Sequence, residues 1–150
     1  MKRKILYLFA FFLFSSCGFA PLYTSNNVDY KINITDISGD NIINTNMINQ
    51  LKKISKPNSK KIFKIRIDTN YEKKIISKDL KGSASDYQLI ATVNIQIEEN
   101  DYVRSITFLE KQNIKKSSDS FDQINYENTI KENFAASFVR KLNLELSAKQ

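Results

Sequence analysis

Histidine and tryptophan are absent from this 150-residue sequence, and cysteine occurs once. Without histidine there is no histidine-based acid–base catalysis, no Ser–His triad and no His/Cys zinc site. A single cysteine also excludes a disulfide within the chain. Only carboxylate or lysine chemistry remains, and no nucleophile stands beside a base in the sequence. We therefore expect neither an enzyme nor a cofactor or metal site.

The composition is typical of one folded domain. Hydrophobic residues make up 41% and charged residues 26% of the chain, which favours a globular over a disordered protein. The length suits one domain of ordinary size. The net charge of +7 favours an anionic partner such as nucleic acid, a membrane surface or a phosphorylated lipid.

The start of the chain has the pattern of a lipoprotein export signal. Basic residues at positions 2–4 precede the uncharged segment 5–14, which is too short to span a bilayer because about 20 apolar residues are needed. Two serines directly precede Cys17, the only cysteine. This pattern predicts that residues 1–16 are a signal peptide and that Cys17 is lipidated, with two or more acyl chains giving a stable membrane anchor.

Two other interpretations of this region stay open. The segment is either a plain signal peptide with an incidental cysteine, or its cysteine is a buried free thiol. Gly18, rather than an aspartate, follows Cys17, as in lipoproteins that are sorted to the outer membrane. Removal of residues 1–16 takes away three positive charges, so the mature chain carries a net charge of +4.

The hydrophobic periodicity of the mature chain predicts one α+β domain. After a lipidated N-terminus and linker at residues 17–29, residues 30–150 show the order strand, helix, three strands, helix. One apolar face per strand and one apolar stripe per helix favour a two-layer sandwich of about four mostly antiparallel strands, with both helices on one face. We expect strands at 30–37, 62–71, 87–97 and 102–111, helices at 41–54 and 125–146, a tight turn at 98–101 and an irregular segment at 112–122.

The residues that follow the predicted lipidation site carry a family resemblance. Residues 17–23 have the sequence Cys-Gly-Phe-Ala-Pro-Leu-Tyr. This resembles the Cys-Gly-Phe-x-Pro-Leu-Tyr opening of the lipopolysaccharide-assembly lipoproteins, the LptE family. The predicted element order β-α-β-β-β-α is similar to the fold of that family.

The resemblance implies a specific function. Members are lipid-anchored at the periplasmic face of the outer membrane, where they plug and help to assemble a large β-barrel partner, LptD, and assist insertion of lipopolysaccharide into the outer leaflet. They are not enzymes. The alternative is an outer-membrane-anchored binding or adaptor lipoprotein that serves another envelope complex or binds a cell-wall polymer. Nucleic-acid binding is disfavoured by the export signal and because aromatic residues are not interleaved with the lysines.

Basic residues concentrate between positions 52 and 81, which hold 11 lysines and arginines and three acidic residues. Lipopolysaccharide phosphates are anionic and suit lysine and arginine partners. The alternative is an ordinary solvated, lysine-rich surface. A second basic cluster lies at positions 111–116. The residues that we predict to bind anionic lipid are Lys64, Arg66, Lys73, Lys74 and Lys78.

A polar row on the predicted strand 87–97 is the other candidate. The alternation places its uncharged polar side chains on the face that points away from the core. A hydrogen-bonding face of this kind would suit the polar inner wall of a β-barrel, and an ordinary solvated sheet face would have the same composition. The row consists of Gln88, Thr92, Asn94 and Gln96.

Overall fold

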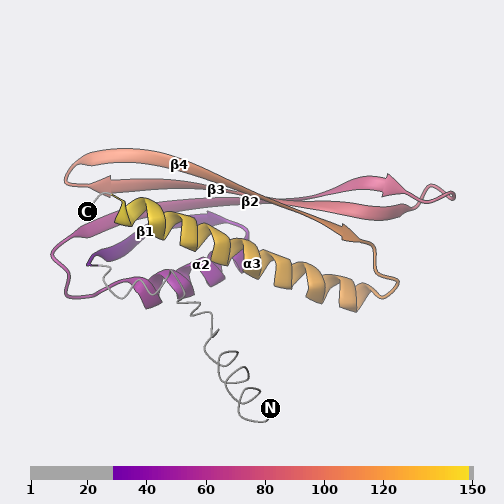
Figure 1. Ribbon diagram of the computed structural model, residues 1–150, viewed down its shortest axis with the longest axis horizontal. Helices are drawn as coiled ribbons and strands as arrows, with labels where there is room; N and C mark the ends of the chain where they lie inside the picture. Colours follow the sequence, from indigo (N-terminus) through magenta and orange to yellow (C-terminus); the bar gives the residue numbers. More distant parts are fainter. Residues whose placement is uncertain (1–28, 149–150) are drawn as a thin grey trace, which may run out of the picture.

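The computed structural model describes residues 29–148, which form a four-stranded sheet with both helices on one face (Figure 1). The strand order is β1-β2-β3-β4, with β1 parallel to β2 and the other two pairings antiparallel. This confirms the predicted two-layer α+β architecture and its element order. The elements are β1 (Lys31–Gly39), α2 (Asn41–Ile54), β2 (Ile62–Lys78), β3 (Ala84–Glu99), β4 (Tyr102–Lys115) and α3 (Ser120–Ser147).

The connection from β1 to α2 depends on a glycine and an aspartate. Gly39 has φ +97°, and a Cβ there would lie 1.7 Å from the carbonyl oxygen of Thr69 on β2. Asp40 then caps the helix, because its Oδ1 accepts hydrogen bonds from the backbone N–H groups of Ile42 and Ile43, each at 3.0 Å. The chain thus leaves the sheet in a sharp turn. Helix α2 then carries it back to the starting end of β1, so that β2 can run parallel to β1.

The hairpin between β3 and β4 confirms the predicted tight turn. Asn100 and Asp101 have φ values of 47° and 67° and separate Glu99 from its partner Tyr102. Positive φ at both central residues is the geometry of a type I′ turn, which favours asparagine and aspartate. This turn fixes the register of the pairing between β3 and β4.

The core lies between the sheet and the two helices. The buried stripe of α3 packs against β3 and β4, and α2 packs against β1 and α3. Leu144, in the same helix, is 50% exposed and stands outside the stripe. Burial raises the pKa of the Tyr30 hydroxyl to about 12, and this hydroxyl donates a hydrogen bond to Asn143 Oδ1. The largest fully buried side chains include Tyr30, Phe63, Ile65, Ile67, Leu89, Ile95, Phe138 and Leu142.

Three strands and one helix extend by several residues beyond the bounds that the sequence predicts. β2 continues from the predicted end at Tyr71 to Lys78, and its partner β3 begins at Ala84. The predicted irregular segment 112–122 is wrong for most of its length, because β4 runs to Lys115 and α3 begins at Ser120. Figure 1 shows β2 and β3 continuing as a hairpin beyond both helices. The strands there have no helix layer to cover, so they need no apolar face.

Candidate interaction surface on the open sheet face

The sheet face opposite the helices is not covered by any residue between 29 and 148. On β2, Phe63, Ile65 and Ile67 are buried beneath the helices, and the residues between them are exposed. The register carries this alternation across the sheet. We call the resulting surface the open face. It consists of Asn33, Thr35, Asp36 and Ser38 of β1; Lys64, Arg66, Asp68, Asn70, Glu72 and Lys74 of β2; Gln88, Ile90, Thr92, Asn94, Gln96 and Glu98 of β3; and Val103, Ser105, Thr107, Leu109, Lys111 and Asn113 of β4.

Hydrogen bonds between neighbouring strands order the uncharged groups of the open face. Thr107 Oγ1 donates to Asn94 Oδ1 at 2.7 Å, and Gln88 Nε2 donates to Asn113 Oδ1 at 3.0 Å. Side-chain amides and hydroxyls have more donor and acceptor sites than these bonds use. The face therefore keeps hydrogen-bonding capacity for a partner while its side chains are held in place.

The charges of the open face are balanced, with four acidic and four basic side chains. Lys64 Nζ lies 2.7 Å from Glu98 Oε1, and Lys74 Nζ lies 3.0 Å from Glu72 Oε2. The hydrogen bond that Lys64 donates to Glu98, together with the charge of Glu98, raises the pKa of Lys64. The hydrogen bond that Lys74 donates to Glu72 lowers the pKa of Glu72. A phosphate group at these lysines would have to compete with carboxylates that are already present.

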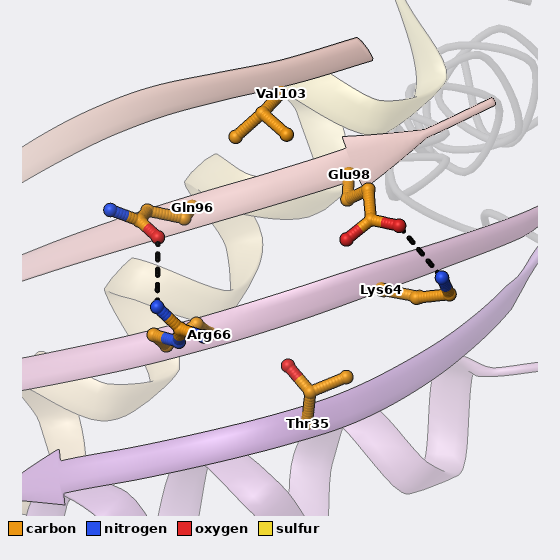
Figure 2. A pocket seen from close by; sticks show the side chains of 6 residues that line it. All are labelled: Thr35, Lys64, Arg66, Gln96, Glu98 and Val103. Carbon is orange, nitrogen blue, oxygen red and sulfur yellow. Dashed lines mark hydrogen bonds and ion pairs between the residues drawn. The ribbon is translucent and has the colours of Figure 1, made fainter. Parts of the chain in front are cut away.

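A shallow hollow at one end of the open face shows this pairing (Figure 2). Lys64 points toward Glu98 on one side, and on the other side Arg66 donates to Gln96 Oε1 at 3.5 Å. Arg66 Nε also lies 3.5 Å from Asp36 Oδ2. The two cations of the hollow are therefore neutralised by neighbouring carboxylates. Such a hollow suits hydrogen bonding to a partner more than binding of a free anion.

The five predicted lipid-binding residues do not form one cluster. Lys64, Arg66 and Lys74 lie on the open face, as the alternation predicts. Lys73 lies on the opposite face, because neighbouring residues of a strand point to opposite sides. It pairs with Glu127 of α3, and its Nζ is 4.1 Å from the centroid of the Tyr87 ring. Lys78 is exposed near the end of the β2–β3 hairpin and makes no ion pair within residues 29–148.

Polar contacts that sequence reasoning missed hold α3 to the rest of the domain. Lys131 Nζ lies 2.6 Å from Asp40 Oδ2 and 4.0 Å from the centroid of the Tyr71 ring. The buried Tyr71 hydroxyl has no hydrogen-bond partner in this part of the chain, and burial raises its pKa. Asp40 and Lys131 are 91 residues apart, so no local pattern in the sequence signals their contact.

A second contact of this kind involves Glu110 of β4. Its carboxylate accepts a hydrogen bond from Ser137, and Lys141 Nζ lies 2.8 Å away. Burial raises the pKa of Glu110, but the hydrogen bonds from Lys141 and Ser137 outweigh burial and the pKa is lowered overall. Both contacts are structural, since they lie on the helix side of the sheet.

The described residues contain neither a metal-binding cluster nor a membrane-spanning helix. Among residues 29–148, no three side chains of the types His, Cys, Asp and Glu are grouped so that they could hold a metal ion. Neither α2 nor α3 is long and apolar enough to cross a bilayer. The predicted lipidation site Cys17, the signal peptide and residues 17–28 of the linker lie outside the described residues.

Comparison with known proteins identifies the fold. The sequence matches no known family profile, and no curated protein is significantly similar to it. Rare lipoprotein B from Shewanella oneidensis superimposes with a TM-score of 0.58 at 10% identity, covering 80% of this chain and 99% of that chain. A candidate lipoprotein from Caulobacter crescentus gives a TM-score of 0.54 at 15% identity, covering 77% and 88%. This chain thus shares the fold of two bacterial proteins described as lipoproteins.

Proposed function

We propose that this protein is an outer-membrane lipoprotein that plugs and helps to assemble an LptD-type β-barrel, and so assists lipopolysaccharide insertion into the outer leaflet. The observation that carries the proposal is the open face, a polar and charge-balanced sheet surface that no described residue covers. The predicted lipidation at Cys17, the sequence of residues 17–23 and the fold shared with rare lipoprotein B support it.

The chemistry of the open face suits the inside of a barrel. The inner wall of an outer-membrane barrel is polar. A surface buried against such a wall must have its polar groups paired, since each unpaired buried group is costly. The open face offers side-chain amides and hydroxyls for this pairing. Because Lys64 and Glu98 already neutralise each other, their burial leaves no lone charge behind.

In this proposal the protein acts by position and not by catalysis, and needs no cofactor beyond the acyl chains on Cys17. Its remaining role is to handle lipopolysaccharide. Of the predicted residues, Lys64, Arg66 and Lys74 belong to the open face that the barrel wall would cover, and Lys73 is paired with Glu127 of α3. Lys78, which has no acidic partner in the described chain, is the most available of them.

The proposal is tested by affinity purification of the full chain from its native host. A carboxy-terminal tag is used in mild detergent, partners are identified by mass spectrometry, and the mass of the amino-terminal peptide is recorded. We expect stoichiometric recovery of a large β-barrel and an acylated Cys17. Asn94→Arg, at the centre of the open face, should lower recovery of the barrel at least about tenfold, because it buries an unpaired charge.

The matched control is Asn49→Arg, the same substitution at an exposed position of α2 on the other side of the molecule. It should leave recovery unchanged. Equal loss with both variants would contradict the assignment of the open face. An acylated protein without a barrel would contradict the plug and favour the adaptor lipoprotein of another envelope complex or cell-wall polymer. An unmodified Cys17 would contradict the lipid anchor.

A further inference from the structure

The net positive charge of the described chain is concentrated at one end of the molecule. We define the distal end as residues 73–86 and 111–126, which comprise the end of the β2–β3 hairpin, the last part of β4 and the first turns of α3. It holds seven lysines and four acidic residues, whereas the remaining described residues hold twelve basic and twelve acidic side chains. The excess of three positive charges therefore belongs entirely to the distal end.

The same end exposes most of the large apolar side chains. Six of the eleven exposed ones in the described chain are here, although the distal end is about a quarter of its length. The hairpin tip, residues 76–83, is the extreme case. Leu80 at its turn is fully exposed, and Ile76 at a β-bulge is 48% exposed. Figure 1 shows this hairpin projecting beyond both helices, so no other element can cover these side chains within the domain.

The lysines of the hairpin tip have no acidic partner in the described chain, and its aspartate is engaged in hydrogen bonds within the turn. Lys78 and Lys81 flank Leu80, and neither ammonium group has an acidic partner within residues 29–148. Asp79 Oδ1 accepts hydrogen bonds from the backbone N–H groups of Lys81 and Ser83, each at 2.9 Å. The carboxylate thus holds the turn in shape, and the two lysines and the leucine remain at its surface.

We propose that the hairpin tip inserts Leu80 and Ile76 into the interface of a bilayer that contains acidic phospholipids. Apolar side chains next to lysines are the combination that binds such an interface, because the side chains leave water while the ammonium groups meet lipid phosphates. Each contribution is small, so the tip acts as a second membrane contact in addition to the lipid anchor. This inference goes beyond the proposed plug, since it needs no barrel partner.

The absence of tryptophan makes the test direct. Leu80→Trp introduces the only tryptophan of the chain, and Ile62→Trp places the same reporter at an exposed position near the opposite end of β2. Each full-length, acylated variant is reconstituted into vesicles of phosphatidylethanolamine and phosphatidylglycerol with brominated acyl chains. We expect the bromines to quench the tryptophan at position 80 several-fold more than the one at position 62, with a blue shift of its emission.

Two further arms keep the inference falsifiable. Lys78→Gln with Lys81→Gln, or vesicles of phosphatidylcholine alone, should reduce quenching at position 80 toward that at position 62. Equal quenching at both positions, or no effect of the lysines and the acidic lipid, would overturn the proposal. Protection from iodide without quenching by bromine, seen only with a co-purified barrel, would assign the tip to the barrel wall instead. The Asn94→Arg experiment tests the plug separately, so either proposal can fail alone.

Discussion

The two halves of β2 have the same secondary structure for different reasons. In the first half, Phe63, Ile65 and Ile67 are fully buried beneath the helices, and the strand forms because it covers a core. From Glu72 to Lys78, every side chain is exposed. This second half is a strand because it pairs with β3, and the hydrophobic effect contributes little to it. Burial stabilises the proximal part, defined as the described residues outside the distal end, and cross-strand pairing maintains the hairpin.

This difference separates folding from interaction. A residue in the proximal core cannot change without a cost in stability, whereas the hairpin tip can vary with little effect on the fold. The exposed leucine and the unpaired lysines at that tip contribute nothing to the core. The bilayer proposal gives these side chains a role outside the domain.

The largest expected effect contrasts one core residue with one tip residue. Phe138→Ala removes a fully buried ring from α3 and should lower the free energy of unfolding by about 3–5 kcal/mol. Leu80→Ala should change it by less than about 0.5 kcal/mol, since Leu80 is fully exposed. Urea denaturation followed by circular dichroism measures both. Similar losses for the two variants would show that the hairpin tip belongs to the cooperative core.

Periodicity predicted the proximal part because burial there leaves a pattern in the sequence. The strand at 62–71 follows from the alternation around Ile65, and the helix at 125–146 follows from the apolar stripe around Phe138. The added residues of β2 are all exposed, those of β3 are half-buried and those of β4 bury only Ile114, so none of these ends shows the alternation that predicts a strand. The start of α3 was missed for a related reason: its cap, Asp119, precedes exposed turns with no apolar stripe.

The residue composition of the open face can be predicted from the sequence, but its ion pairs between strands cannot. The polar row of β3 and the shared face of Lys64 and Arg66 follow from a period of two. Glu98 and Asp36, which neutralise these two cations, lie 34 and 30 residues away in the sequence. Their contacts depend on strand register, which one strand's pattern does not fix. The sequence therefore predicted a basic surface where the structure has a balanced one.

A pair of glycines sharpens the contrast between the two parts. Gly39→Ala should destabilise the protein by at least about 2 kcal/mol, because the new Cβ would lie 1.7 Å from Thr69 O and the backbone has φ +97°. Gly82→Ala, at φ +81° in the hairpin tip, has nothing within 4 Å and should cost about 1 kcal/mol of backbone strain. Thermal unfolding of both variants checks this order, and a reversed order would contradict the described turn at the end of β1.

The smallest expected effect is on the pH dependence of the free energy of unfolding. It should distinguish the contributions of two glutamates whose pKa values are both lowered. Glu110 is partly buried against Ser137 and Lys141 of α3, whereas Glu72 pairs with Lys74 on the open face. A carboxyl with a lowered pKa in the folded state stabilises the protein above its unfolded pKa of about 4.3 and loses this contribution as the pH falls through the folded pKa.

We therefore expect the free energy of unfolding to fall between about pH 5 and pH 3, and Glu110→Gln to flatten that fall measurably. Glu72→Gln should flatten it much less, because solvent screens the exposed pair. Urea titrations at several pH values give both slopes. If both variants flattened the pH dependence equally, contact with α3 would not increase the stabilisation that an ion pair on this sheet provides. An effect confined to Glu110 would show that the helix layer, which the open face lacks, is what makes a charge contact on this sheet stabilising.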